Sequence, residues 1–114
     1  MPGTFDAEVI VAGAGPAGAS AARALAAAGI DTLLVDRAEF PRNKPCGGGI
    51  SLRALRRFPW LGAALAGIDV HRIARLHLEG PGGAALDLDH TDPCVLLIRR
   101  VQFDHALVQQ AMAA

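Results

Sequence analysis

Residues 7–36, AEVIVAGAGPAGASAARALAAAGIDTLLVD, decide the fold of this chain. Residues 7–12 form a short apolar, β-branched run that ends at a glycine, which predicts a strand buried on both faces. Residues 16–28 are rich in alanine, the strongest helix former, and Gly29 follows where a helix C-cap is expected. Residues 31–36 form a second apolar run that closes on a carboxylate. This order predicts a right-handed βαβ unit with parallel strands.

A G-x-G-x-x-G pattern lies between the first expected strand and the helix. Its first glycine permits a tight turn, its second lets the backbone approach a pyrophosphate, and its third lets the helix pack closely on the strand. The helix N-terminus then offers unpaired N–H groups and the positive end of its dipole to phosphates. We expect the whole turn to bind a dinucleotide through Gly13, Ala14, Gly15, Pro16, Ala17 and Gly18.

Asp36 closes the second expected strand, about 20 residues beyond the turn, where an acid can accept hydrogen bonds from an adenosine ribose. Its negative charge should repel a 2′-phosphate, so NADP is disfavoured at this site. The turn and the acid do not by themselves separate NAD from FAD, and a glycine-rich turn without a ligand is the plainer alternative.

The next stretch, residues 37–49, changes composition abruptly. RAEFPRNKPCGGG holds two prolines, three consecutive glycines and three cations, which predicts a functional or flexible loop. Ser51 is placed to cap a following helix that Pro59 ends. The arginines of that helix, Arg53, Arg56 and Arg57, read as a solvated face, with contact to an anionic lipid headgroup as the weaker alternative.

The second half of the chain reads as strands followed by one helix. Residues 71–77 and 84–88 predict two strands of a hairpin, joined by the turn signal GPGG. Residues 95–98, VLLI, predict a further buried strand. Residues 102–113 predict a helix with its apolar residues on one face. That face consists of Phe103, Ala106, Leu107 and Ala111.

Composition narrows the function classes. The chain has 114 residues, is 52% hydrophobic and 19% charged, and carries no net charge, so it should bury a core and has no basic field for nucleic acid. Two cysteines are too few for a disulfide scaffold and fit a reduced, cytoplasmic compartment.

The apolar residues 9–28 contain three glycines, Pro16 and Arg23, so we expect no transmembrane segment. No pair among the four histidines has zinc-site spacing, so we expect no metal.

Two segments resemble a known family. DRAEFPRNKPCGGGIS, residues 36–51, resembles the segment that follows the acid in FAD-dependent oxidoreductases of the geranylgeranyl reductase family. RRVQFDHALVQQA, residues 99–111, is similar to that family's arginine motif R-x-x-F-D-x-x-L-x-x-x-A. The wider relatives are the p-hydroxybenzoate hydroxylase-like flavoproteins. Residues 52–93 carry no diagnostic signature.

The resemblance implies an α/β Rossmann-type FAD-binding domain and FAD as the cofactor. It implies an enzyme that reduces isoprenoid double bonds in a small, prenyl-type substrate, with an electron donor such as a nicotinamide cofactor. By the same analogy, Arg37 and Arg42 lie along the adenosine and pyrophosphate, and Arg100 lies near the cofactor. The Cys46, Gly47 and Gly48 loop lies near the flavin. Arginine suits forked phosphate contacts, and glycines let backbone come close to a flat ring.

Cys46 is a weak candidate for a redox or substrate-shaping role, because the neighbouring charge of Lys44 should favour its thiolate. The alternative is a small residue tolerated in a tight turn. Cys94 precedes an apolar strand and is expected to be a buried small hydrophobe. Ser51 has no nucleophile context, so helix capping is the better account.

The elements add up to only part of a doubly wound domain, with a partly parallel sheet, a hairpin insertion and open sheet edges. We expect residues 1–114 to be the N-terminal part of an FAD-binding domain, with the rest of that domain and the substrate domain beyond Ala114. Alone, the chain should be inactive, and its last helix should have little to pack on. Two rivals stay open, an FAD-dependent monooxygenase of the hydroxylase group and a non-catalytic nucleotide-binding fragment.

Overall fold

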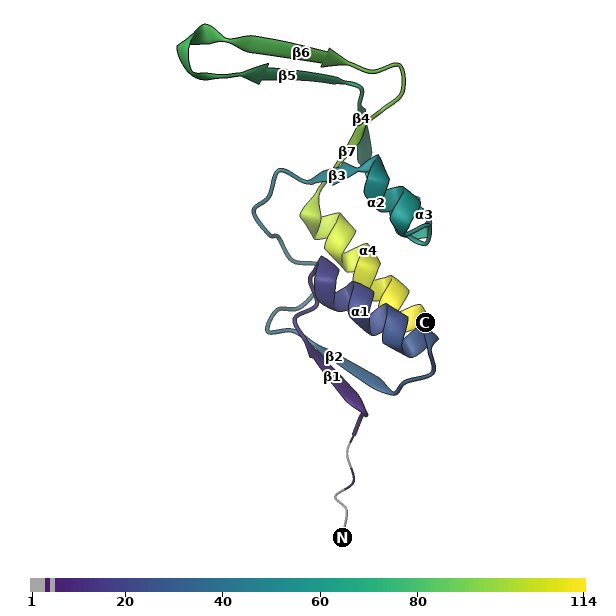
Figure 1. Ribbon diagram of the computed structural model, residues 1–114. Helices are drawn as coiled ribbons and strands as arrows, with labels where there is room; N and C mark the ends of the chain where they lie inside the picture. The colour runs from purple at the N-terminus through teal and green to yellow at the C-terminus, as the bar shows by residue number, and fades with distance from the viewer. Residues whose placement is uncertain (1–3, 5) are drawn as a thin grey trace.

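A computed structural model of the protein describes Thr4 and residues 6–114 (Figure 1). Helices and strands alternate in the first part of the chain, and strands dominate the second part until a final long helix. In chain order the elements are β1 (Val9–Ala12), α1 (Pro16–Ala27), β2 (Thr32–Val35), β3 (Gly49–Ser51), α2 (Leu52–Arg57), α3 (Leu61–Leu65), β4 (Val70–Ile73), β5 (Arg75–Glu79), the short 3-10 turn η1 (Pro81–Gly83), β6 (Ala85–Asp89), β7 (Val95–Ile98) and α4 (Arg100–Ala113).

The βαβ unit forms as predicted. β1 and β2 pair in parallel, with Val9 opposite Thr32 and Ala12 opposite Val35, and α1 connects them. Helix α1 ends at Ala27 with Ala28 as its C-cap, and Gly29 follows with a positive φ of 80°, close to where the sequence predicted the helix end. The expectation that β1 is buried on both faces is wrong, because its residues alternate between half-buried and exposed, and Ile10 is 64% exposed. Helix α1 covers one face of this two-stranded sheet.

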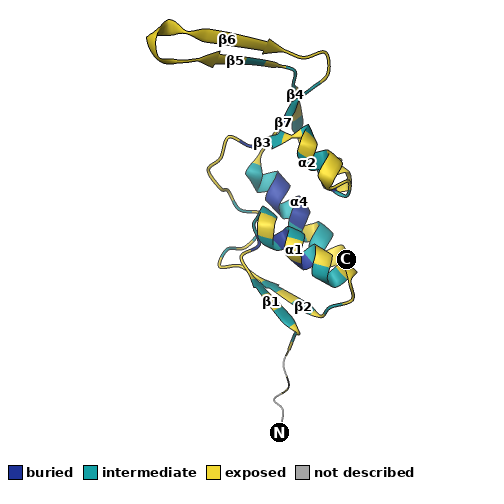
Figure 2. Ribbon diagram, in the orientation of Figure 1, coloured by how far each residue is buried: buried dark blue, intermediate teal, exposed yellow. Residues whose placement is uncertain are grey.

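A second, antiparallel sheet has the order β3–β7–β4, with β7 in the centre. Leu96 and Ile98 of β7 are buried, whereas Leu97 is 37% exposed, so the expected buried strand is buried on one face only. Helix α4 begins directly after β7 and lies side by side with α1 (Figure 1). The face of α1 and the face of α4 that meet consist of small or buried residues. Figure 2 shows the buried residues of both helices in dark blue.

The core lies between α1, α3 and α4. Its buried residues are Ala19, Leu61, Ala64, Ile98, Phe103, Ala106 and Leu107. Three of the four residues expected on the inner face of the last helix are therefore buried, while Ala111 is half-buried. The expectation that this helix has little to pack on is wrong, because α1 and α3 both contact it. Alanines on α1 let the two helix backbones approach closely.

The hairpin β5–β6 differs from its prediction in one respect. The expected strand 71–77 is divided at Ala74: β4 pairs with β7, whereas β5 pairs with β6. The N–H of His90 donates to the Ala74 carbonyl at 2.9 Å and closes the base of the hairpin. The turn at residues 80–83 falls where the GPGG signal placed it. Beyond Ala74 the hairpin projects away from the core (Figure 1).

Two short helices follow β3. The Ser51 hydroxyl accepts a hydrogen bond from the Ala54 N–H at 3.4 Å, so Ser51 caps α2 as predicted. Helix α3 was not predicted, because its five residues carry no side-chain cap. The guanidinium of Arg23 lies 4.4 Å above the Trp60 ring and joins α1 to the residue before α3. Among the described residues, no helix combines the length and apolarity needed to cross a membrane.

Candidate functional site

The glycine turn occupies the junction of β1 and α1. Gly13 has a φ of +102°, and its N–H donates to the Val35 carbonyl at 2.7 Å. A Cβ on Gly18 would lie 1.6 Å from the Gly13 carbonyl oxygen, so only glycine permits this helix to meet this turn. Gly15 is the N-cap residue of α1 and has no side chain that could bond to the first N–H groups of the helix. Pro16 follows in the first turn. The first N–H groups of α1 are thus left for a ligand.

Asp36 lies across from this turn, just after β2. Its Oδ2 accepts a hydrogen bond from the Ala14 N–H at 2.8 Å, and its Oδ1 accepts one from the Ala38 N–H at 2.8 Å. These two bonds, the Ala14 bond first, lower the pKa of the Asp36 carboxyl, and the charges of Arg42 and Arg37 act in the same direction. Each carboxylate oxygen keeps a further lone pair, so the exposed group can still accept from ribose hydroxyls.

A buried carboxylate joins two arginines beside the turn. Asp104, on α4, is fully buried. Arg100 donates to it from Nε at 2.8 Å and from Nη2 at 3.0 Å, and Arg42 donates from Nη1 at 2.6 Å. A Cβ built on Gly15 would lie 3.8 Å from Nη2 of Arg42, so this guanidinium is a neighbour of the glycine turn. The structure therefore brings Arg42, Arg100 and the turn together.

The Cys46–Gly48 loop approaches the same cluster. The Gly48 N–H donates to Cys46 Sγ at 3.3 Å. This bond and the Arg100 side chain lower the pKa of the exposed Cys46 thiol. The expected role of Lys44 is not what the structure shows, since Gly48 and Arg100 are the groups that favour the thiolate. Gly48 has a φ of +73°, and a Cβ there would lie 2.0 Å from the Ile98 carbonyl oxygen.

The remaining predicted cofactor contacts lie at the edges of this region. Arg37 and Gly47 are exposed, and a Cβ on Gly47 would meet nothing within 4 Å. Arg37 follows Asp36 in the chain, and its positive charge contributes to the lowered pKa of the Asp36 carboxyl. The polar groups of this region are the donors of a free helix N-terminus and of two arginines that share one acid, and the acceptor carboxylate at the end of β2. This set fits the pyrophosphate and ribose of a dinucleotide.

Residues outside this region form smaller groups. His77 on β5 contacts Asp87 at 2.5 Å and Glu79 at 2.9 Å, and the Asp87 contact, ahead of the Glu79 contact, raises its pKa. Over Thr4 and residues 6–114, the structure has no group of three or more His, Cys, Asp or Glu residues arranged to hold a metal. Cys94 is half-buried rather than buried, and its thiol donates to the Ile73 carbonyl at 3.5 Å.

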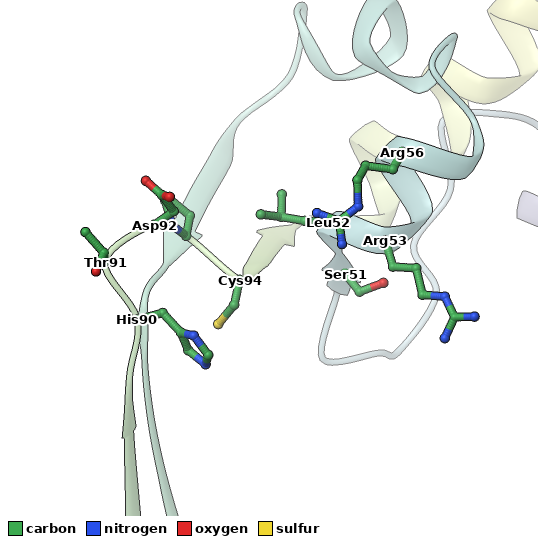
Figure 3. Close-up of a pocket in the computed structure, with 9 residues that line it drawn as sticks. Ser51, Leu52, Arg53, Arg56, His90, Thr91, Asp92 and Cys94 are labelled. Atoms are coloured by element: carbon green, nitrogen blue, oxygen red, sulfur yellow. The ribbon is translucent and has the colours of Figure 1, made fainter.

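A hollow of about 450 Å³ lies between α2 and the segment that leads from β6 to β7 (Figure 3). Arg53 and Arg56 border it from the helix, and His90 and Cys94 border it from the opposite segment. Both arginines are exposed, in keeping with the solvated face expected for this helix. Arg57 is exposed as well, and its guanidinium lies over the Phe58 ring, 5.5 Å from the ring centroid. The hollow is separate from the glycine turn.

Sequence reasoning missed the part that Asp104 plays. It lies 62 positions from Arg42, and no local pattern connects the two. The spacing of four residues between Arg100 and Asp104 on a helix was the available signal, because side chains at that spacing lie on one face.

Strand, glycine turn, helix and acid, with an arginine pair at the turn, define a dinucleotide-binding domain of the flavoprotein class. The chain belongs to the FAD binding domain family, which matches residues 6–114, and FAD is its cofactor. The menaquinone reductase of Mycobacterium tuberculosis is 47% identical over 77 residues, which are 68% of this chain and 19% of that protein. The chloroplastic geranylgeranyl diphosphate reductase of Arabidopsis thaliana is 35% identical over 106 residues, 90% of this chain and 22% of that protein.

Solved structures agree with this assignment. A geranylgeranyl bacteriochlorophyll reductase-like protein from Thermoplasma acidophilum matches with a TM-score of 0.81 and 27% identity, over 94% of this chain and 28% of that chain. A flavin-dependent brominase matches with a TM-score of 0.72 and 18% identity, over 94% of this chain and 27% of that chain, which shows the shared fold alone. The chain spans about a fifth of the length of the curated relatives it matches.

Proposed function

We propose that this chain supplies the adenosine and pyrophosphate half of an FAD site. Asp36 would hold the ribose, and the free N-terminus of α1 would meet the pyrophosphate together with Arg42 and Arg100. The observation that carries this proposal is the position of Arg42 between Gly15 and buried Asp104. We propose the following contacts: Gly13, Ala14, Gly15, Pro16, Ala17, Gly18, Asp36, Arg37, Arg42, Cys46, Gly47, Gly48 and Arg100.

We further propose that the protein carrying this chain is an FAD-dependent oxidoreductase that reduces isoprenoid double bonds. Bound FAD would supply the hydride, and the residues of the chain bind and orient it. The support is the KPCGGG loop and the Arg100–Ala111 motif, together with the likeness to geranylgeranyl diphosphate reductase and menaquinone reductase. In this proposal Cys46 shapes the site beside the flavin. The proposal also includes a nicotinamide cofactor as the electron donor. It includes a cytoplasmic location, since the two free thiols suit a reducing compartment.

An FAD-dependent monooxygenase of the hydroxylase group is the second candidate, because flavin-dependent brominases and halogenases share the fold. The two chemistries leave different products. A reductase adds two hydrogen atoms across a double bond, whereas a monooxygenase inserts an oxygen atom and needs O₂.

The test is turnover of geranylgeranyl diphosphate by the full-length protein, with FAD and a chemical reductant, followed by mass spectrometry. We expect products heavier by pairs of hydrogen atoms, formed equally well without O₂. Products that gain oxygen, or that form only in air, would favour the monooxygenase. A protein that holds FAD but turns over no prenyl substrate would contradict the proposed substrate class.

A further inference from the structure

We propose that Asp104 is a positioning residue for the cofactor site: it fixes Arg42 beside the glycine turn and Arg100 beside Cys46. The inference rests on the FAD site proposed above and assigns a task to a residue that does not itself face the cofactor. Asp104 has 0% exposed surface, while the two arginine side chains keep 17% and 18%. The acid is therefore enclosed, and the two guanidinium groups reach the surface.

Asp104 is a carboxylate that needs partners because it is buried. An ionised carboxylate without partners is strongly disfavoured away from water, and it is tolerated only when paired and hydrogen-bonded. Asp104 receives three N–H donors from two arginines, two of them from the fork of Arg100. The spacing of four residues on α4 already provides Arg100 as a partner. Arg42 comes from a distant loop, so its contact orders that loop as well as pairing the acid.

Arg42 points from the buried acid toward the glycine turn. Its Nη1 is held by Asp104, while its Nη2 lies on the side of Gly15, where the first N–H groups of α1 are free. Within the same loop the Phe40 ring lies against the guanidinium, 4.6 Å from ring centroid to Cζ, while Pro41 and Asn43 are exposed. The ring supports the guanidinium from one face, and the hydrogen bond to Asp104 sets the direction of its nitrogens. An unanchored arginine would lose rotamer freedom each time a phosphate bound. An arginine that is already held loses less, which strengthens binding.

Removing the charge of Asp104 distinguishes a positioning role from a purely electrostatic one. Two arginines and one aspartate leave a local charge of +1, and replacing the acid by its amide raises that charge to +2. If Asp104 acted through its charge alone, the change would attract an anionic pyrophosphate more strongly. If Asp104 positions the arginines, the same change weakens binding, because both guanidinium groups lose their fixed orientation. The two explanations therefore predict opposite changes in the affinity for an anionic pyrophosphate.

The experiment is Asp104→Asn in the full-length protein, with affinities for FAD and for ADP measured by fluorescence or calorimetric titration. We expect both to weaken by at least about tenfold, the size of a lost hydrogen bond between charged groups. The control is Asp69→Asn, which removes the same charge from an exposed residue bonded to Gln102 on α4. The control should bind normally. Equal or tighter binding by Asp104→Asn would overturn the proposal.

Arg42→Lys provides a second test that leaves the buried acid in place with Arg100. Lysine keeps the charge but lacks a planar fork that can contact Asp104 and face the turn together. We expect weaker binding of ADP and unchanged binding of adenosine, which has no phosphate. Wild-type affinity for ADP in this variant would show that charge suffices and that no positioning is needed. If the wild-type protein binds neither FAD nor ADP, the proposed function fails; if it binds both and the variants match it, this inference alone fails.

Discussion

Asp36 shows at the scale of one residue how a turn prepares a ligand site. Backbone N–H groups of Ala14 and Ala38 hold both of its carboxylate oxygens, which fixes the side chain at the end of β2. These bonds lower the pKa of the Asp36 carboxyl, so the anion persists to a lower pH than in a free aspartate. An oriented anion at this point is what a ribose with two hydroxyl groups requires.

We therefore expect Asp36→Ala in the full-length protein to weaken FAD binding by about tenfold or more, since ribose hydroxyls would lose their partner. The matched control is Asp31→Ala, which removes an exposed carboxylate immediately before β2, whereas Asp36 lies immediately after it. Titration of FAD into each variant measures the effect. In the wild type, affinity should be constant near neutral pH and fall only when the pH drops through the lowered pKa. Equal affinities in the two variants would place the ribose elsewhere.

Cys46 is the second residue whose chemistry depends on its neighbours. Because the Gly48 N–H, and after it the Arg100 side chain, lower the pKa of the Cys46 thiol, its reactive thiolate forms at a lower pH than an ordinary cysteine's. We expect iodoacetamide to label Cys46 well before half-buried Cys94, as followed by peptide mass spectrometry. Arg100→Gln should slow the labelling, and Lys44→Gln should not. Slower labelling in the lysine variant alone would restore the role first expected of Lys44.

At the scale of elements, the junction of β1 and α1 is the most demanding contact. A side chain at Gly18 would collide with the Gly13 carbonyl, whereas one at Gly62 on α3 would meet nothing within 4 Å. Gly18→Ala should lower the free energy of unfolding by about 2–3 kcal/mol, as overpacking does. Gly62→Ala should be neutral or stabilising, because alanine favours helix. Urea denaturation of both variants measures this, and equal stabilities would contradict the close strand–helix contact.

The βαβ unit was predictable because its signals are local. A β-branched run, an alanine-rich helix and the glycines between them fix β1, α1 and β2 within one stretch of chain. The division of residues 71–77 into β4 and β5 was not predictable, because it depends on where β7 pairs and where β6 takes over. The contact between Arg42 and Asp104 was not predictable for the same reason. Each was visible in a motif, but their contact joins two segments 62 residues apart.

The hairpin β5–β6 carries another feature that no local pattern reveals. Its leucines lie opposite one another across the two strands, with Leu76 facing Leu88 and Leu78 facing Leu86. Leu78 and Leu86 are 51% and 54% exposed. Leu76 and Leu78 alternate with polar residues along β5, and Figure 2 shows most of the hairpin exposed and apart from the other elements.

At the scale of the whole molecule, the shape is extended. The radius of gyration is 17.9 Å and the extents are 69 × 27 × 21 Å. A globular domain of this length would have a radius of about 13 Å. The projecting hairpin lengthens the molecule (Figure 1), and the β1–β2 sheet has one open face. Both leave apolar side chains in water, Ile10 and Leu33 among them, and such surfaces favour association.

Residues 1–114 expressed alone should therefore melt with poor cooperativity and associate in solution. Small domains have only a few kcal/mol of stability to begin with, and uncovered apolar faces reduce it further. Gel filtration with light scattering and a thermal melt measure both properties. We also expect little FAD to remain bound after the column. A monomer that melts sharply and keeps stoichiometric FAD would show that this chain is a complete binding module.

The central claim is that the glycine turn, Asp36 and the Arg42–Asp104–Arg100 cluster form a site for FAD. The most direct measurement is the visible absorption spectrum of the purified full-length protein, recorded after gel filtration and again after incubation with FAD or NAD. We predict a flavin spectrum, at one FAD per chain after reconstitution, and no displacement of the flavin by NAD. A colourless protein that takes up no FAD and binds NAD instead would contradict the account.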